Sequence, residues 1–73
     1  MNEDEILKKI AFNIKVERMR SKLTQFQLAE MIDVHEKYIG KIESGKQNIT
    51  IKTLIKLAKA LNTSITILVD ITR

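Results

Sequence analysis

Apolar side chains recur every three or four residues along most of the chain, which is typical of amphipathic helices. The first such segment covers residues 4 to 21. Three acidic residues lie in or near its first turn, where they stabilise the positive end of the helix dipole. Its apolar positions are Ile6, Leu7, Ile10 and Ile14. The pattern therefore predicts a long N-terminal helix.

A second helix is predicted from its start signal. Thr24 is followed three residues later by Gln27, the spacing of a capping box, in which each side chain bonds the backbone of the other residue. Leu28 and Ala29 then supply an apolar face that continues to about Ile32. We expect Ala29 to lie where this helix crosses the next one, because only a small side chain lets two helices approach closely.

A tight turn at Asp33 leads into a third helix. Asp tolerates the left-handed backbone that such a turn needs, although less well than Gly does. The third helix is predicted from about His35 to Ser44, and Gly45 ends it. Two short helices joined by a short turn, here within about residues 24 to 43, form a helix-turn-helix.

The last third of the chain predicts a fourth helix and leaves its final residues open. Thr50 is a good N-cap and Asn62 a good stop signal. The apolar stripe between them consists of Ile51, Leu54, Ile55, Leu57, Ala58 and Leu61. Ser64 can cap a short fifth helix, but the β-branched residues after it fit an extended tail equally well. Residues 1 to 73 thus predict one all-α domain of five helices.

Composition narrows the range of functions. Thirteen Lys and Arg residues against nine Asp and Glu give a net charge of +4, which suits a polyanionic partner. The absence of Cys and the single His35 argue against metal sites and disulfides, and no cofactor is expected. No nucleophile paired with a base and no Gly-rich phosphate loop points to an enzyme. The acidic N-terminus and the lack of long apolar runs predict a soluble, cytoplasmic protein with no membrane contact.

Several motifs at fixed spacing carry a family resemblance. The run LTQFQLAEMIDVHEKYIGKIESGKQNITIKTLIKLAKALNTS resembles the lambda-repressor-like (XRE, Cro-type) helix-turn-helix family. With the first helix included, the resemblance covers about residues 6 to 69. Within the family, VHEKYIGKIESGKQNIT is similar to the small controller proteins of restriction–modification systems. The chain departs from the family pattern at Lys22 and Asp33, where Gly is usual, and at Glu17, where many members bury an aliphatic residue.

The resemblance implies a role for each of several polar residues. The third helix would enter a DNA major groove, which is about 12 Å wide, and its exposed residues would face base edges. The implied base-contacting residues are His35, Glu36, Lys37 and Lys41. The implied phosphate-contacting residues are Gln25, Ser44, Lys46, Gln47 and Asn48. Tyr38 is added from its chemistry, because its ring can pack on the second helix while its hydroxyl reaches a phosphate. Glu36 is equally compatible with stabilising the helix start, and Arg18 and Glu43 match a structural ion pair between the first and third helices.

These expectations combine into a sequence-specific transcriptional regulator that binds a pseudo-palindromic operator as a homodimer. One recognition helix covers few base pairs, so two half-sites about 34 Å apart are needed, and a two-fold dimer sets that spacing. The dimer surface is predicted within about residues 60 to 73, at Ile65, Ile67, Leu68, Val69 and Ile71. An antitoxin or adaptor that binds a protein partner through the same apolar segment is the alternative. No small-molecule ligand is expected.

Overall fold

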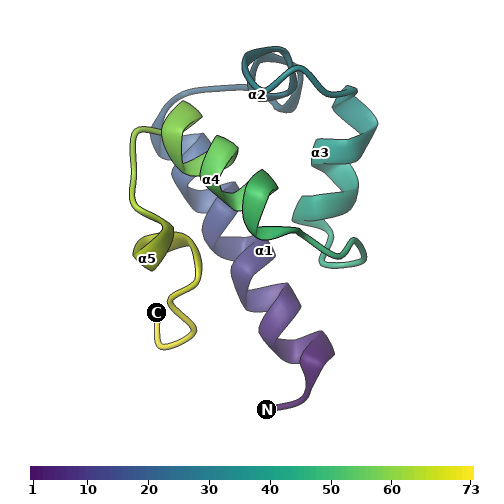
Figure 1. Ribbon diagram of the computed structural model, residues 1–73, viewed down its shortest axis with the longest axis vertical. Coiled ribbons are helices and arrows are strands. Elements are labelled where there is room, and N and C mark those ends of the chain that lie inside the picture. Colours follow the sequence, from purple (N-terminus) through teal and green to yellow (C-terminus); the bar gives the residue numbers. More distant parts are fainter.

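The computed structural model describes residues 1–73 as five helices with no strand, so the predicted all-α architecture is confirmed. The helices are α1 (Glu3–Arg20), α2 (Gln25–Met31), α3 (Glu36–Glu43), α4 (Ile51–Ala60) and α5 (Ile65–Leu68). In Figure 1, α1 runs behind α4 through the middle of the molecule, and its N-terminal turns extend beyond the other helices. The α2–turn–α3 unit lies at one end, and α5 lies on the other side of α4. None of the helices combines the length and apolarity needed to cross a bilayer.

Every helix begins at a polar N-cap residue whose side chain accepts a hydrogen bond from the backbone of the first turn. The caps are Asn2, Thr24, His35, Thr50 and Ser64. The predicted capping box of α2 is formed, because Thr24 Oγ1 accepts from Gln27 N at 3.0 Å and Gln27 Oε1 accepts from Thr24 N at 2.8 Å. Each N-cap side chain typically stabilises its helix by about 1 kcal/mol. The helix starts are therefore encoded locally, which is why the sequence predicts them well.

Three helices end in the same backbone motif, with one residue in the left-handed region. Lys22, Asp33 and Asn62 have φ of 58°, 58° and 52° after α1, α2 and α4. The next amide in each case bonds back to the carbonyl five residues earlier, as in Leu23 N to Arg18 O at 3.2 Å. Glycine adopts this conformation most easily, so the departures from the family pattern at Lys22 and Asp33 carry mild backbone strain.

Gly45, after α3, combines a left-handed backbone with close packing. Its φ is 77°, and a Cβ added there would lie 2.8 Å from Lys8 Cγ and 3.2 Å from Lys8 Cα. The loop after α3 therefore packs directly on the backbone of α1. A side chain at residue 45 would push the two apart.

The core draws on all five helices. Its buried apolar members are Ile14, Leu28, Ala29, Ile32, Ile39, Ile42, Leu54, Leu57, Ala58, Leu61 and Leu68. Ala29 of α2 is buried, as expected for a residue at a helix crossing. The predicted apolar stripe of α4 is too broad, however, because Ile51 and Ile55 are exposed. The core is only wide enough to cover one side of this helix.

The chain after Ser64 forms one turn of helix and then an irregular turn, which decides between the two alternatives that the sequence leaves open. Leu68 is fully buried in the core, so its predicted place in a dimer interface is wrong: it has no surface to offer a partner. Ile67 and Val69 are exposed, and Ile65 and Ile71 are half-buried. The segment therefore serves both the core and the surface.

Glu17 stands nearly buried on α1 where the family usually has an aliphatic residue. Its carboxylate accepts from Arg73 Nη2 at 3.0 Å and lies 3.4 Å from Arg20 Nη1. Beside it, the buried Asn13 amide donates to Leu68 O at 3.1 Å and to Asp70 O at 2.8 Å. The helical register of α1 thus places a polar pair, rather than an apolar one, against the end of the chain.

Asp70 gives a prediction on pH dependence. The Thr72 hydroxyl and then the Thr72 amide donate to its carboxylate, at 2.6 and 2.9 Å, and lower the pKa of Asp70 below 3.8. A lowered folded-state pKa means that the ionised carboxylate stabilises this turn above pH 3.8, and that the effect is lost as the pH falls through the folded-state pKa. We expect Thr72→Val to raise the pKa of Asp70 toward 3.8, measured by NMR titration of the carboxyl carbon. A native Asp70 titrating at or above 3.8 would contradict this assignment.

Candidate nucleic-acid interface

A buried ion pair joins the first three helices behind the candidate interface. Arg18 Nε and Nη2 donate to the two carboxylate oxygens of Glu43 at 2.7 and 3.0 Å, so the implied pair is present as a bidentate contact between α1 and α3. Gln25 Nε2 donates to the same carboxylate at 3.1 Å, which adds the first residue of α2. Arg18 Nη1 also donates to Leu23 O at 2.7 Å, just before α2 begins. We call these four residues the Arg18 network.

Burial makes the Arg18 network rigid. The side chains of Arg18 and Glu43 are 12% and 3% exposed, so little water competes for their hydrogen bonds. Every buried side-chain nitrogen and oxygen of the protein has a hydrogen-bond partner. The N-terminus of α2 and the C-terminus of α3 are therefore fixed relative to each other. These are the two places that frame the exposed face of α3.

That exposed face forms a shallow polar groove between α2 and α3. Its volume is about 420 Å³, and no hydrophobic residue lines it. The lining residues are Gln25, Glu36, Lys37, Gly40, Lys41 and Ser44. The structure therefore brings together three predicted base-contacting and two predicted phosphate-contacting residues. The groove presents two ammonium groups and one carboxylate. It therefore suits a partner that offers a row of hydrogen-bonding groups with negative charges beside them.

His35 acts first as a helix cap. Its Nδ1 accepts from Lys37 N at 3.1 Å, which leaves Nε2 as the ring nitrogen that carries the proton in the neutral form. The side chain is exposed at the start of α3 but does not line the groove. His35 can therefore offer a single donor from the end of the helix, with its ring orientation set by the cap.

Two predicted phosphate-contacting residues, Ser44 and Tyr38, already make contacts within the protein. The Ser44 hydroxyl donates to Lys41 O at 2.7 Å, so it must rotate before it can donate to a phosphate. Tyr38 is half-buried and packs against the core, outside the groove. Its ring helps to fix α3, and its role toward a phosphate stays a prediction.

The loop after α3 is polar and lies beside the groove rather than in it. Lys46 and Asn48 are exposed, and Gln47 is half-buried. Asn48 lines a separate hollow of about 220 Å³ with Glu3, Ile6, Leu7 and Ile10 of α1. Asn48 thus lies beside the N-terminal turns of α1, in a hollow that also contains Glu3, whose carboxylate repels phosphate. Lys46 is the stronger phosphate candidate of the three.

Gly40 is a groove residue that the sequence analysis missed. It lies in the middle of α3 between Lys37 and Lys41, and a Cβ there would meet only Gln25 Oε1, at an ordinary 3.6 Å. Packing therefore does not require glycine at this position. A glycine inside a short helix lowers the stability of that helix, and Gly40 also lies between two exposed lysines. These two features together could have marked Gly40 as part of a contact surface.

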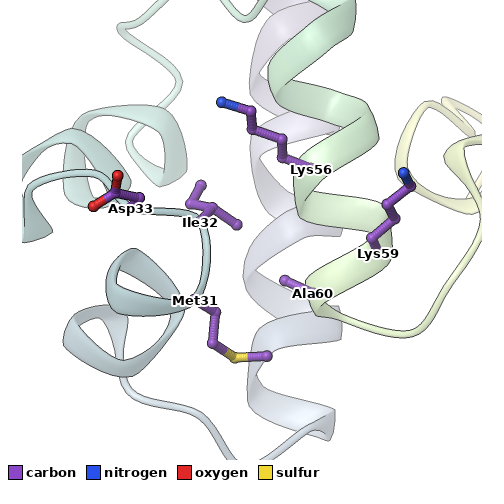
Figure 2. Close-up of a pocket in the computed structure, with 6 residues that line it drawn as sticks. All are labelled: Met31, Ile32, Asp33, Lys56, Lys59 and Ala60. Carbon is purple, nitrogen blue, oxygen red and sulfur yellow. The ribbon is translucent and has the colours of Figure 1, made fainter.

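The largest hollow lies elsewhere, between the α2–α3 turn and α4, with a volume of about 510 Å³. Figure 2 shows its six lining residues: Met31, Ile32, Asp33, Lys56, Lys59 and Ala60. In this view Lys56 and Lys59 extend on different sides of α4, so their ammonium groups do not converge on one point. None of the predicted DNA-contacting residues belongs to this hollow, and Lys52, Lys56 and Lys59 of α4 are exposed to solvent.

Comparison with known proteins matches this arrangement. The helix-turn-helix family profile covers residues 14–68, from the middle of α1 to the end of α5. The chain belongs to the helix-turn-helix family. The control protein C.SmaI of Serratia marcescens is 48% identical over 56 residues, which cover 77% of this chain and 67% of that protein. The family and this control protein make the chain a DNA-binding transcriptional regulator, and they give no support for an antitoxin or adaptor.

Solved structures of restriction-modification controller proteins share this arrangement of helices over most of the chain. The restriction-modification controller protein C.AhdI from Aeromonas hydrophila superposes with a TM-score of 0.81 at 29% identity, over 85% of this chain and 94% of its own. The controller protein C.Esp1396I, solved as a tetramer in complex with its natural 35 base-pair operator, superposes with a TM-score of 0.78 at 35% identity. That match covers 86% of this chain and 83% of the other.

The Arg18 network predicts a large and specific effect on stability. We expect Arg18→Met to lower the free energy of unfolding by about 3–5 kcal/mol, because it leaves the carboxylate of Glu43 buried without a counter-charge. Urea denaturation followed by circular dichroism measures the loss. Arg20→Met is the matched control: this guanidinium is 69% exposed and lies 3.4 Å from Glu17, which keeps Arg73 as a partner, so its removal should cost less than about 1 kcal/mol. Equal losses in the two variants would show that the buried pair has no special weight.

Proposed function

We propose that this protein is the controller of a restriction–modification system, and that it regulates transcription by binding a pseudo-palindromic operator as a homodimer. Its action is binding without a catalytic step, at DNA in the cytoplasm. The observation that carries the proposal is the polar groove on α3, which gathers Lys37, Lys41 and Glu36 on one exposed face. The similarity to control proteins, one of them solved in complex with its operator, supports the role of a restriction–modification controller.

The chemistry of the groove fits the edges of base pairs. Lys37 and Lys41 lie one turn apart and can donate to the O6 and N7 atoms of guanine, while the carboxylate of Glu36 can accept from the amino group of cytosine. Gln25 begins α2, where free backbone amides favour a phosphate, and Lys46 supplies a cation beyond the other end of α3. Phosphate contacts at both ends would set the register of α3 in the major groove, and the lysines would read the bases.

Exposed apolar residues on α4 and α5 support a surface there for a second copy. Ile67 and Val69 of the predicted interface are exposed. On α4, which packs against α5, Ile51 and Ile55 are exposed as well and lie one turn apart. We therefore extend the proposed dimer surface to the outer side of α4 and remove Leu68 from it. Exposed branched apolar side chains on two neighbouring helices are typical of surfaces that become buried on association.

Selection of bound duplexes from a random pool tests the DNA-binding role. The protein should enrich a two-fold symmetric site with half-site centres about one helical turn, or a multiple of it, apart. With Lys41→Ala, preference should be lost at one symmetric pair of positions, since each such contact contributes about 1–3 kcal/mol of discrimination. Lys52→Ala, on the solvated face of α4, serves as the control and should leave the enriched site unchanged. Enrichment without symmetry, or no enrichment, would contradict the proposal.

A charge placed on the outer side of α4 tests the dimer surface. Ile51 and Phe26 are 67% and 54% exposed, and both lie in the first turn of a helix, where Asp is well tolerated. We expect Ile51→Asp to raise the dimer dissociation constant by about tenfold or more, because a two-fold symmetric dimer would bury one new carboxylate from each protomer. Phe26→Asp on α2 should leave it unchanged. Sedimentation equilibrium without DNA measures both, and an unaltered constant in Ile51→Asp would remove α4 from the surface.

A further inference from the structure

Two contacts fasten the end of the chain to α1. Asn13, which is almost fully buried, donates through Nδ2 to the carbonyl oxygens of Leu68 and Asp70 at 3.1 and 2.8 Å. One helical turn further along α1, Glu17 accepts from Arg73 Nη2 at 3.0 Å. We call Asn13, Glu17 and Arg73 the C-terminal clamp. It holds the segment from Leu68 to Arg73 at both of its ends.

The segment that the clamp holds is the one that presents apolar surface. Arg73 Nη1 reaches back to Ile67 O at 3.4 Å, so one guanidinium connects the carboxylate of α1 with the backbone of α5. Val69 lies between the two carbonyl groups that Asn13 holds. The side chains of Ile67 and Val69 are exposed. The clamp thus fixes the backbone on which these two side chains stand.

Core packing does not explain the charge at Glu17. A nearly buried carboxylate loses hydration, and an apolar side chain of similar size usually stabilises a fold at least as well. Its contact with Arg20 is a 3.4 Å pair within α1 in which the guanidinium is 69% exposed, so this contact contributes little. Its contact with Arg73 is the one that crosses to another part of the chain. A charge at this position is therefore explained by what it holds rather than by what it packs against.

We propose that Glu17 and Arg73 are positioning residues for dimerisation, which hold the chain end in the single conformation that presents Ile67 and Val69 to a second copy of the protein. This rests on the homodimer of the proposed function. Apparent affinity falls in proportion to the fraction of protein in the binding-competent conformation, and a two-fold dimer needs that conformation in both protomers. A chain end that is ordered about one third of the time therefore raises the dissociation constant about ninefold.

The test compares Arg73→Ala with Arg20→Ala in the full chain. Each variant removes one guanidinium from Glu17, but only Arg73 also donates to the backbone of α5, at Ile67 O. Sedimentation equilibrium should show the dimer dissociation constant rising about tenfold in Arg73→Ala and staying unchanged in Arg20→Ala. Amide hydrogen exchange should become faster at residues 67 to 70 in Arg73→Ala, while exchange in α2 and α3 stays at the native rate.

A second variant separates positioning from a general loss of stability. Glu17→Gln keeps the shape of the side chain and removes its charge, and it should weaken the dimer as Arg73→Ala does. Because Glu17 reaches this segment through Arg73, the double variant should be no weaker than Arg73→Ala alone. Additive effects, or a native dissociation constant in Arg73→Ala, would overturn the clamp while leaving the dimer in place. A native chain that stays monomeric would contradict the homodimer itself, and the positioning role with it.

Discussion

The bidentate contact between Arg18 and Glu43 is the constraint on which the geometry of the interface depends. α2 and α3 are short, with seven and eight residues, and helices of this length are not stable alone in water. Apolar packing by Leu28 and Ile39 brings them together, but hydrophobic contact is not directional and tolerates small rotations. Four hydrogen bonds from Arg18 and Gln25, three of them to one carboxylate, tolerate much less. They convert a hydrophobic cluster into a defined angle between two helices.

This constraint lies directly behind the groove. Gln25 belongs to the Arg18 network through its nitrogen, and its oxygen lies on the groove side, 3.6 Å from where a Cβ of residue 40 would be. The same side chain therefore connects the buried ion pair with the exposed face of α3. A buried ion pair is weak grounds for high stability, since its desolvation cost offsets much of its attraction. Its value here is geometric: it sets where Lys37 and Lys41 stand relative to the start of α2.

The sequence predicted those parts of the fold whose signals are local. The capping box at Thr24 and the N-caps at Thr50 and Ser64 each depend on residues within one turn, so they could be identified without knowing what lies nearby. The resemblance implied that Lys37, Lys41 and Gln25 all face DNA. The short turn between α2 and α3 is what brings them close together in the structure. The exposure of Ile51 and the burial of Leu68 could not be predicted, since each depends on which side of its helix the rest of the chain covers. The clamp joins residues more than fifty positions apart, and no local pattern connects Asn13 or Glu17 with the chain end.

A homodimer of the kind proposed bears directly on the specificity of DNA binding. A recognition helix of eight residues offers only two or three side chains to base edges, and each contributes about 1–3 kcal/mol of discrimination. A two-fold dimer doubles that sum without any new contact type, and it rejects half-sites at the wrong spacing. In the proposed homodimer, the apolar surface of α4 and α5 would determine specificity as directly as the lysines of α3, because discrimination by two half-sites requires both to be occupied by one rigid unit. A chain of this size leaves part of its apolar surface outside the core, and one portion of it, at Ile51, Ile55, Ile67 and Val69, lies on the helices of the proposed dimer surface.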